Sequence, residues 1–249
     1  MKAPQRSRLD NLLVARGLAA SPQKAQAMIL AGEIFVDGAR VSKAGTAVAE
    51  DASLEVNSRE QKYASRGGFK LEGALRDFQV STAGRVCLDV GSSTGGFTDC
   101  LLQHGASRVY AVDVTVDQIV WKLRQNPRVV RVERNARELN SRDIPEPVDL
   151  ITVDVSFISA GKILGPAVAV AKPGADFLIL VKPQFELARE DIGPGGIVSS
   201  DSLHEKAIAT VRNAAESTDL ICLGVRPSQL TGAEGNQEYF LHARKKPLE

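Results

Sequence analysis

The stretch Val86-Cys-Leu-Asp-Val-Gly-Ser-Ser-Thr-Gly-Gly-Phe-Thr-Asp99 joins an apolar run to a glycine-rich turn. The apolar run contains one acid, Asp89, close to its end, which is typical of a buried strand that leads into a functional loop. Gly91, Gly95 and Gly96 follow, and glycine lets a backbone turn tightly or approach a ligand where a Cβ atom would collide. The stretch therefore predicts a strand, a glycine loop and a helix, the repeating unit of α/β sheets.

The spacing of these glycines indicates which kind of ligand the loop holds. It matches neither the dinucleotide pattern GxGxxG nor the phosphate pattern GxxxxGK[ST], because no lysine follows the glycines. An acid before Gly-x-x-x-Gly suits a ligand that carries an ammonium and a sulfonium but no phosphate. That ligand is S-adenosylmethionine (SAM), with an ordinary glycine-rich turn as the alternative.

A second acid strengthens the SAM hypothesis. Asp113 ends the next apolar run, where α/β nucleotide folds hold ribose hydroxyls with a carboxylate. Asn135 follows the third run and is placed either to contact the adenine edge or to cap a helix. The predicted cofactor-binding residues are Asp89, Gly91, Ser92, Gly95, Gly96, Phe97, Asp113 and Asn135.

Working outward, apolar runs alternate with helix-length segments from about residue 63 onward. The expected strands are Val86–Val90, Val109–Val114, Val129–Val132, Leu150–Val155 and Phe177–Val181, with a closing hairpin of Leu220–Val225 and Tyr239–Ala243. Such runs favour parallel strands that are covered on both faces. We predict an α/β domain with a Rossmann-like sheet, whose ligands lie beyond the carboxyl ends of the strands.

The N-terminal segment has a different pattern, that of a small α+β unit. Leu9, Leu12 and Leu13 share one face of a helix that stops at Gly17, and Ser21-Pro22 supplies the cap and first turn of a second helix. Short strands are expected around Ile34–Val36 and Leu54–Val56, with a turn at Asp37-Gly38. We place this unit at residues 1–58, a linker at 59–64 and the larger domain at 65–249.

Composition excludes several classes of protein. The three cysteines and three histidines lack metal-ligand spacing, so no metal site is expected; Cys87 and Cys222 stand in apolar runs that favour burial. No signal peptide opens the chain, and no apolar stretch approaches the roughly 18 residues that span a bilayer. We expect a cytoplasmic protein without a membrane partner, and nothing in the sequence indicates its oligomeric state.

The motifs resemble those of the TlyA family of rRNA 2′-O-methyltransferases, whose members are also labelled hemolysin A. The N-terminal unit is similar to the RNA-binding domain of ribosomal small-subunit protein four, an S-four-like domain. The remainder resembles the FtsJ-type methyltransferase fold. The matching strings are Ser65-Arg-Gly-Gly-Phe-Lys-Leu71, Asp89–Phe97, Asp154-Val-Ser-Phe-Ile-Ser159, Val181-Lys-Pro-Gln-Phe-Glu186 and Gly235-Asn-Gln-Glu-Tyr-Phe240.

The resemblance implies a catalytic Lys-Asp-Lys-Glu tetrad formed by Lys70, Asp154, Lys182 and Glu238. Asp154 and Lys182 also follow the fourth and fifth expected strands, so both should face the crevice at the carboxyl edge of the sheet. The alternative for Lys182 is that its ammonium extends to solvent. We assign Lys182 as the general base, or as the group that steers the ribose hydroxyl, with the carboxylates orienting the lysines.

The expected activity is SAM-dependent 2′-O-methylation of a ribose in ribosomal RNA, with a cytidine implied by the resemblance. The partner is ribosomal RNA or a ribosomal subunit. Residues 1–43 have a net charge of +4, and the expected phosphate contacts are Arg6, Arg8, Arg16, Lys24 and Arg40, each of which is otherwise a solvated surface cation.

The loop Glu190–Gly196 is either a flexible cover for substrate or an ordinary surface loop. Two rival functions are an RNA-binding assembly factor without catalysis and a membrane-lytic hemolysin.

Overall fold

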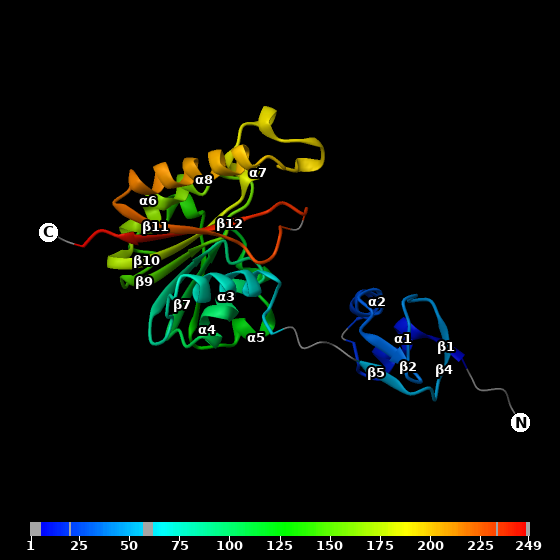
Figure 1. Cartoon of the computed structure of the whole chain (residues 1–249). Coiled ribbons are helices and arrows are strands. Elements are labelled where there is room, and N and C mark those ends of the chain that lie inside the picture. The colour runs from blue at the N-terminus through cyan, green and yellow to red at the C-terminus, as the bar shows by residue number, and fades with distance from the viewer. Residues whose placement is uncertain (1–5, 20, 57–61, 233, 248–249) are drawn as a thin grey trace, which may run out of the picture. The chain divides into compact units, whose positions relative to one another are not determined.

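A computed structural model describes residues 6–19, 21–56, 62–232 and 234–247 of the chain. The chain forms two compact units, Met1–Gln61 and Lys62–Glu249, and the folds of both are drawn in Figure 1. Residues 59–61, half of the predicted linker, lie outside the described residues. Lys62 and the residues that follow it belong to the larger unit.

The smaller unit packs two helices beside two small sheets. Helices α1 (Leu9–Ala15) and α2 (Pro22–Leu30) confirm the two predicted helices, and the Ser21 hydroxyl accepts a 3.2 Å hydrogen bond from the Lys24 backbone N–H as the cap of α2. A three-stranded antiparallel sheet has the order β3-β2-β5, and a two-stranded sheet pairs β1 with β4. Their bounds are β1 Arg6–Arg8, β2 Ile34–Val36, β3 Ala39–Arg40, β4 Ala47–Ala49 and β5 Leu54–Val56.

The larger unit is built on a seven-stranded sheet of order β11-β12-β10-β9-β6-β7-β8. The five strands from β10 to β8 are parallel, while β12 is antiparallel to β10 and forms the predicted hairpin with β11. The bounds are β6 Val86–Val90, β7 Arg108–Asp113, β8 Val129–Glu133, β9 Val148–Val153, β10 Ala171–Val181, β11 Leu220–Pro227 and β12 Tyr239–Lys245. Every strand predicted for this domain is present; the ends agree within two residues except at β10, which begins at Ala171 instead of the predicted Phe177.

Helices cover both faces of this sheet, as Figure 1 shows. Apolar side chains of α3 and α4 pack on one face, and those of α6 and α8 pack on the other, each burying its own core. Cys87 and Cys100 are buried in the first of these cores, whereas Cys222 is only partly buried. The helices are α3 Gly67–Asp77, α4 Gly96–Gln103, α5 Trp121–Arg124, α6 Gly161–Ala169, α7 Pro183–Glu186 and α8 Asp201–Glu216, with short 3-10 turns η1 Val116–Gln118, η2 Ala136–Glu138, η3 Arg189–Asp191 and η4 Pro194–Gly196.

The order of the strands locates the likeliest place for a ligand. Along the chain, β6, β7 and β8 are added in one direction, and β9 and β10 are then added on the other side of β6. Ligands of doubly wound sheets bind at such a reversal, beyond the carboxyl ends of the strands. The reversal lies between β6 and β9. Among the described residues, no helix combines the length and the apolar character needed to cross a membrane.

Candidate active site

The pairing of the strands brings three chemically active residues, and the glycine loop, to one edge of the sheet. Gly91 follows β6 and Asp154 follows β9, and the Asp154 backbone N–H donates to the Val90 carbonyl at 2.9 Å. Lys182 follows β10, and Glu238 directly precedes β12. Val181 is paired with Tyr239, so continuing that antiparallel register by one residue sets Lys182 opposite Glu238.

The four predicted catalytic side chains form two ion pairs at this edge. Lys182 Nζ lies 2.6 Å from Asp154 Oδ1, and Lys70 Nζ, which α3 contributes, lies 2.5 Å from Glu238 Oε2. The Lys182–Asp154 contact has the distance of an ion pair. It lacks the angles of a hydrogen bond, so Asp154 Oδ1 has no hydrogen-bond donor among the described residues. The structure thus brings together, in pairs, residues that are up to 168 positions apart.

These charges are withdrawn from water. Lys182 is 9% exposed and Glu238 is 2% exposed. A buried charge is costly unless it is paired, and both of these charges have a partner of opposite sign. Lys182 therefore does not extend to solvent, which was the alternative left open by its sequence. A buried lysine held at the end of a strand is a group arranged for chemistry or recognition.

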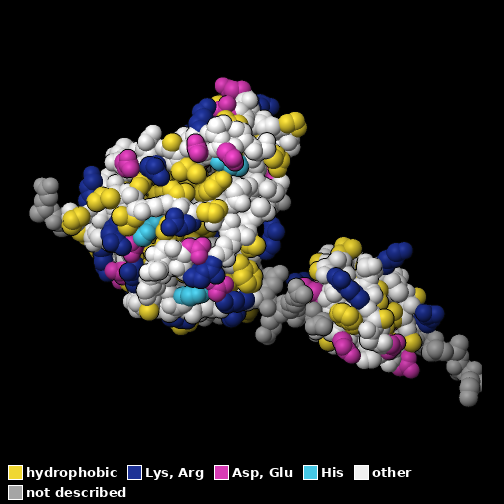
Figure 2. Space-filling view, viewed as in Figure 1, with side chains coloured by type: hydrophobic (Ala, Val, Ile, Leu, Met, Phe, Trp, Pro, Cys, Tyr) yellow, Lys and Arg dark blue, Asp and Glu magenta, His cyan; other side chains and the backbone are white. Residues whose placement is uncertain are grey.

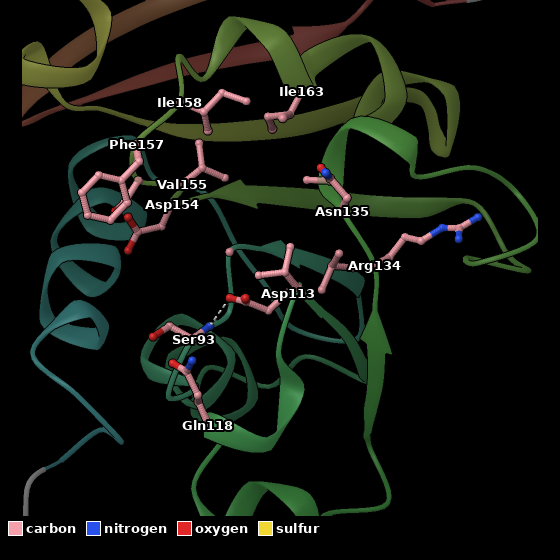
Figure 3. Close-up of a pocket in the computed structure, with 15 residues that line it drawn as sticks. Ser93, Asp113, Gln118, Arg134, Asn135, Asp154, Val155, Phe157, Ile158 and Ile163 are labelled. Carbon is pink, nitrogen blue, oxygen red and sulfur yellow. Dashed lines mark hydrogen bonds between the residues drawn. The ribbon is translucent and has the colours of Figure 1, made fainter.

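A cavity of about 380 Å³ opens at the reversal of the sheet (Figure 3). Four predicted site residues line it: Gly91, Asp113, Asn135 and Asp154. Figure 3 shows Asp154 on one side of the cavity, Asn135 on another and Asp113 between them. The remaining lining residues are Ser93, Val112, Val114, Gln118, Arg134, Ala136, Val155, Ser156, Phe157, Ile158 and Ile163.

Gly91 is required where the loop enters the cavity. Its φ is +86°, in the region that side chains other than glycine rarely adopt. A Cβ atom at this position would lie 2.3 Å from the Asp154 carbonyl oxygen, which is far inside van der Waals contact. The bare α-carbon therefore lets the loop after β6 pass directly against the end of β9, beside Asp154.

Asp113 is oriented by the glycine loop itself. The Ser93 backbone N–H donates to Asp113 Oδ2 at 2.9 Å, the dashed line in Figure 3, and the Thr115 backbone N–H donates to Oδ1 at 3.3 Å. An ionised carboxylate offers about four acceptor positions, so two such bonds leave room for two hydroxyl donors. This is the geometry needed to hold the two hydroxyls of a ribose.

Asn135 is a helix cap and also lines the cavity. Its Oδ1 accepts from the Arg137 backbone N–H at 3.1 Å and so caps η2. The residue also lines the cavity. With the carbonyl oxygen committed to the cap, the amide NH₂ is the group that can donate to a ligand.

Asp89 lies beneath the glycine loop and does not line the cavity. It is fully buried, with Oδ2 accepting from the Thr98 hydroxyl at 2.6 Å and Oδ1 accepting from the Thr152 hydroxyl at 3.0 Å. Burial raises the pKa of Asp89 to about 7, because removing a carboxylate from water disfavours its charged form. Asp89 thus connects the loop, through Thr98 on α4, to the neighbouring strand β9.

The other predicted loop residues also pack away from the cavity. Ser92 is buried, Gly95 is the N-cap residue before α4, and a Cβ atom on Gly96 would lie 2.1 Å from the Ser65 hydroxyl. Phe97 is buried against Phe240, with 6.1 Å between the ring centroids. Of the eight predicted cofactor residues, the structure places three at the cavity and five in the packing that supports it: Asp89, Ser92, Gly95, Gly96 and Phe97.

Several lining residues were not anticipated. Ser93 and Gln118 lie near Asp113 in Figure 3, and Ser156 and Phe157 follow the catalytic Asp154. Phe157 is 91% exposed and has a φ of +64°, an unusual combination for a bulky residue. The sequence did offer one sign of its importance, because Phe157 lies within the family-matching string Asp154–Ser159. Within the residues that the structure describes, no three His, Cys, Asp or Glu side chains gather as metal ligands.

The loop that follows α7 is fastened to the segment that carries Glu238. Asn236 is buried, its Nδ2 donates to the Gly196 carbonyl at 2.8 Å, and its Oδ1 accepts from the Val198 backbone N–H at 2.8 Å. Lys206 pairs with Asp191 at 2.6 Å at the other end of the loop. These contacts hold the loop in this conformation. They favour the hypothesis that residues 190–196 form an ordinary surface loop over the hypothesis that they form a flexible cover.

The five predicted RNA-contacting cations lie on the smaller unit. Figure 2 shows Lys and Arg side chains spread over the visible face of this unit among apolar and acidic ones. Four of the five donate hydrogen bonds within the unit: Arg6 to Ala47, Arg8 to Asp10, Arg16 to Ala52, and Arg40 to Ala31. The Arg8 guanidinium lowers the pKa of the buried Asp10 to about 2, so Arg8 also has a structural role.

Known proteins share both units. A model of the FtsJ-like methyltransferase family matches residues 63–245, and a model of the S4 domain matches residues 7–53. The protein named 16S/23S rRNA (cytidine-2′-O)-methyltransferase TlyA, from Mycobacterium tuberculosis, is 45% identical over 242 residues, covering 96% of this chain and 90% of that protein. Hemolysin A of Brachyspira hyodysenteriae is 42% identical over 242 residues, covering 94% of this chain and 98% of that protein.

Solved structures agree with these matches. A protein called a hemolysin, from Streptococcus thermophilus, has a TM-score of 0.75 at 38% identity and covers 98% of this chain and 90% of its own. A SAM-dependent methyltransferase from Mesorhizobium loti has a TM-score of 0.51 at 17% identity over 71% of this chain and 98% of its own, a likeness of fold alone. The predicted fold and resemblance are confirmed. The chain belongs to the TlyA family, in which an S4 domain precedes an FtsJ-like methyltransferase domain.

Proposed function

We propose that this chain transfers a methyl group from SAM to the 2′-hydroxyl of a cytidine ribose in ribosomal RNA. The observation that carries the proposal is the pairing of two lysines with two carboxylates at one edge of the sheet, where Lys182 and Glu238 are buried and Asp154 lines the cavity. An FtsJ-like methyltransferase domain and an S4 domain in one chain support it. So does the activity for which the relative from Mycobacterium tuberculosis is named.

The lining of the cavity fits SAM. Asp113 has acceptor positions left for the ribose hydroxyls, and Asn135 has its NH₂ group to offer to the adenine edge. Gly91 lets the backbone lie close to the ligand, and the apolar Ile158 and Ile163 supply a surface for the flat base. We assign Asp89, Ser92, Gly95, Gly96 and Phe97 to the same cofactor site as the residues that hold its loop in place.

In the proposed reaction, bound SAM supplies a methyl carbon that is activated by an adjacent sulfonium. The ribose oxygen forms a bond to this carbon as the bond from carbon to sulfur breaks, and the hydroxyl proton leaves the oxygen. Lys182 accepts that proton in its amine form, or holds the oxygen in line through its Nζ donors. Asp154 holds Lys182 by charge, and Glu238 holds Lys70 in the same way.

Alignment is the larger contribution of this site. Fixing oxygen, carbon and sulfur in line can lower the barrier by roughly 7–11 kcal/mol. A general base contributes about 10²- to 10⁴-fold, equivalent to roughly 3–5 kcal/mol. Because both lysines are paired and withdrawn from water, they are positioned before the substrate arrives. The pairs therefore serve mainly to fix where the hydroxyl sits.

The N-terminal unit supplies affinity for RNA in this proposal. Its phosphate contacts are Arg6, Arg8, Arg16, Lys24 and Arg40, and a guanidinium with five donors can bind a phosphate while one or two donors serve its own unit. We propose the domain bounds 1–58 and 65–249 with a linker at 59–64. The site of action is the cytoplasm, on ribosomal RNA or on ribosomal subunits.

The exposed ring of Phe157 fits this substrate. Recognition of single-stranded or extruded nucleotides uses aromatic faces on which bases stack. Phe157 lines the cavity close to Asp154 (Figure 3), so it offers such a face on the side of the cavity where Asp154 lies. Its backbone has a positive φ, and its ring centroid lies 5.2 Å from that of Phe185.

The test is methylation of isolated ribosomal subunits with labelled SAM, followed by mapping of the modified nucleotide. We expect label on the ribose of a cytidine, and a Lys182→Ala protein that transfers little of it. Label on a base, or equal transfer by Lys182→Ala, refutes the assignment. A protein that binds RNA but transfers no methyl group is the assembly factor instead. Liposome leakage that persists after loss of Lys182 supports the lytic rival.

A further inference from the structure

Ser156 is the nearest polar neighbour of Lys182 that the tetrad does not include. It follows β9 by three residues, and Lys182 Nζ donates a hydrogen bond to its Oγ at 2.9 Å. Ser156 also lines the cavity. The parallel register of β9 and β10, which pairs Val153 with Ile179, sets Ser156 beside Lys182 when continued by three residues.

The two neighbours of Lys182 act on it differently. Asp154 Oδ1 lies 2.6 Å from Nζ but outside hydrogen-bond geometry, so the carboxylate supplies attraction without a fixed direction. The Ser156 oxygen does accept a hydrogen bond from Nζ, and within the described part of the chain no other hydrogen bond from Nζ is found. A hydrogen bond is directional, whereas an ion pair at this range is much less so.

Direction matters because a lysine side chain is a flexible stem with three rotatable donors. When one donor is held by Ser156 and the ammonium is drawn toward Asp154, the third donor, or the lone pair after proton loss, has a defined direction. A misplacement of about 1 Å can cost roughly 100-fold in rate where alignment dominates the barrier. A neutral hydroxyl can fix that direction without adding another charge beside the pair.

We propose that Ser156 is a positioning residue for Lys182 in methyl transfer: its hydroxyl fixes the direction of Nζ toward the ribose oxygen. This inference rests on the proposed function. Ser156 is assigned no proton transfer and no role in holding SAM, so its removal should lower the rate of the bound complex without weakening either ligand.

The chain offers a matched control three residues away. Ser159 belongs to the same loop, and its hydroxyl donates to Glu186 Oε2 at 2.6 Å instead of contacting Lys182. Ser159→Ala therefore removes the same group from the same loop while leaving the lysine untouched. Ser156→Thr keeps a hydroxyl on the β-carbon and serves as the conservative variant.

The experiment measures single-turnover methylation of ribosomal subunits at saturating SAM and RNA, with the two dissociation constants measured separately. We expect Ser156→Ala to lower the rate by roughly 10- to 100-fold, within the range that misalignment produces. Both dissociation constants should stay within about two-fold, Ser156→Thr should recover most of the rate, and Ser159→Ala should keep the parent rate. A parent rate in Ser156→Ala, or a loss that appears only as weaker binding, overturns the inference.

A second measurement does not need activity. In full-length protein labelled at the lysine Nζ and Cε atoms, the Lys182 signals are assigned by their absence in Lys182→Arg. Ser156→Ala should shift these signals and speed exchange of the ammonium protons with water, while Ser159→Ala should not. Unchanged Lys182 signals in Ser156→Ala overturn the inference.

Failure of this inference can be distinguished from failure of the proposed function. If the parent protein transfers no methyl group to rRNA, the proposed function fails and the role of Ser156 fails with it. If the parent is active and Ser156→Ala is unaffected, only the role of Ser156 is refuted.

Discussion

Replacing Asp89 by asparagine should make the stability of the larger unit less dependent on pH. Asp89 is fully buried, and burial raises its pKa from the ordinary 3.8 to about 7. Between these two values the unfolded chain has released the proton while the folded protein retains it. Folding stability therefore falls as the pH rises through this window and is greatest below the unfolded pKa.

The size of the effect follows from the shift. Each unit of pKa difference corresponds to about 1.36 kcal/mol, so the full effect is about 4 kcal/mol, of which about 3 kcal/mol develops between pH 4.5 and 7.5. Asparagine has no proton to lose, and the Thr98 and Thr152 hydroxyls can each donate or accept, so they can still bond its amide. The variant should escape this loss of stability.

Urea unfolding followed by far-ultraviolet circular dichroism measures the effect. The free energy of unfolding of Asp89→Asn minus that of the parent should rise by about 3 kcal/mol from pH 4.5 to pH 7.5. Because both proteins share every other titrating group, their contributions cancel in this difference. Asp117→Asn, at an exposed carboxylate of the same unit, controls for the loss of one charge. A difference that stays constant with pH refutes the account of Asp89.

Three further changes test other parts of the structure. Gly91→Ala should lose about 2–6 kcal/mol of stability, from backbone strain plus overlap with the Asp154 carbonyl, whereas Gly165→Ala, with open space around it, should lose none in thermal unfolding. Phe157→Ala should leave stability nearly unchanged but lower kcat/KM for RNA by roughly 5- to 150-fold, the value of about 1–3 kcal/mol for one stacked base; an unaltered kcat/KM rules out stacking there. Lys24→Ala should weaken RNA binding and reduce the salt slope of the association constant by about 0.7–0.9, with SAM affinity unchanged; an unchanged slope removes Lys24 from the interface.

The larger fold could be predicted because its signals are local and strong. A buried parallel strand must be apolar along its length, so β6, β7 and β9 stand out as runs. The two-residue to three-residue strands of the smaller unit were partly missed, as with β1 and β4. Segments this short have no periodicity to detect, and the pairing that defines them comes from residues about forty positions apart.

The candidate site was predictable in its chemistry and less so in its geometry. Asp154, Lys182 and Glu238 follow or precede strands, so the position of the strands places these three at one edge, whereas Lys70 comes from α3. The partner of each lysine depends on where α3 packs and how the register continues, which the sequence does not display. The directions of the residues in the glycine loop could not be predicted either. Gly91 lines the cavity, whereas Gly96 lies against Ser65 and Phe97 against Phe240. A turn followed by a helix points successive residues in different directions.

Side-chain contacts outside the motifs could not be predicted from the sequence either. Ser156 contacts Lys182 only because β9 and β10 are neighbours in the sheet, although they are separated along the chain by α6. Asn236 holds the loop after α7 through two hydrogen bonds, and no local sequence pattern predicts them. Such contacts are products of packing between distant segments.

The most direct test of the two lysine–carboxylate pairs is a double-mutant cycle on single-turnover transfer from SAM to ribosomal subunits, using Lys182→Met, Glu238→Gln and the double variant. Residues that act as one unit show strongly non-additive losses. We expect each single variant to lose most of the transfer rate and the double variant to lose little more than the worse single one. Losses that multiply, or a Lys182→Met protein that transfers at the parent rate, would contradict a shared catalytic centre.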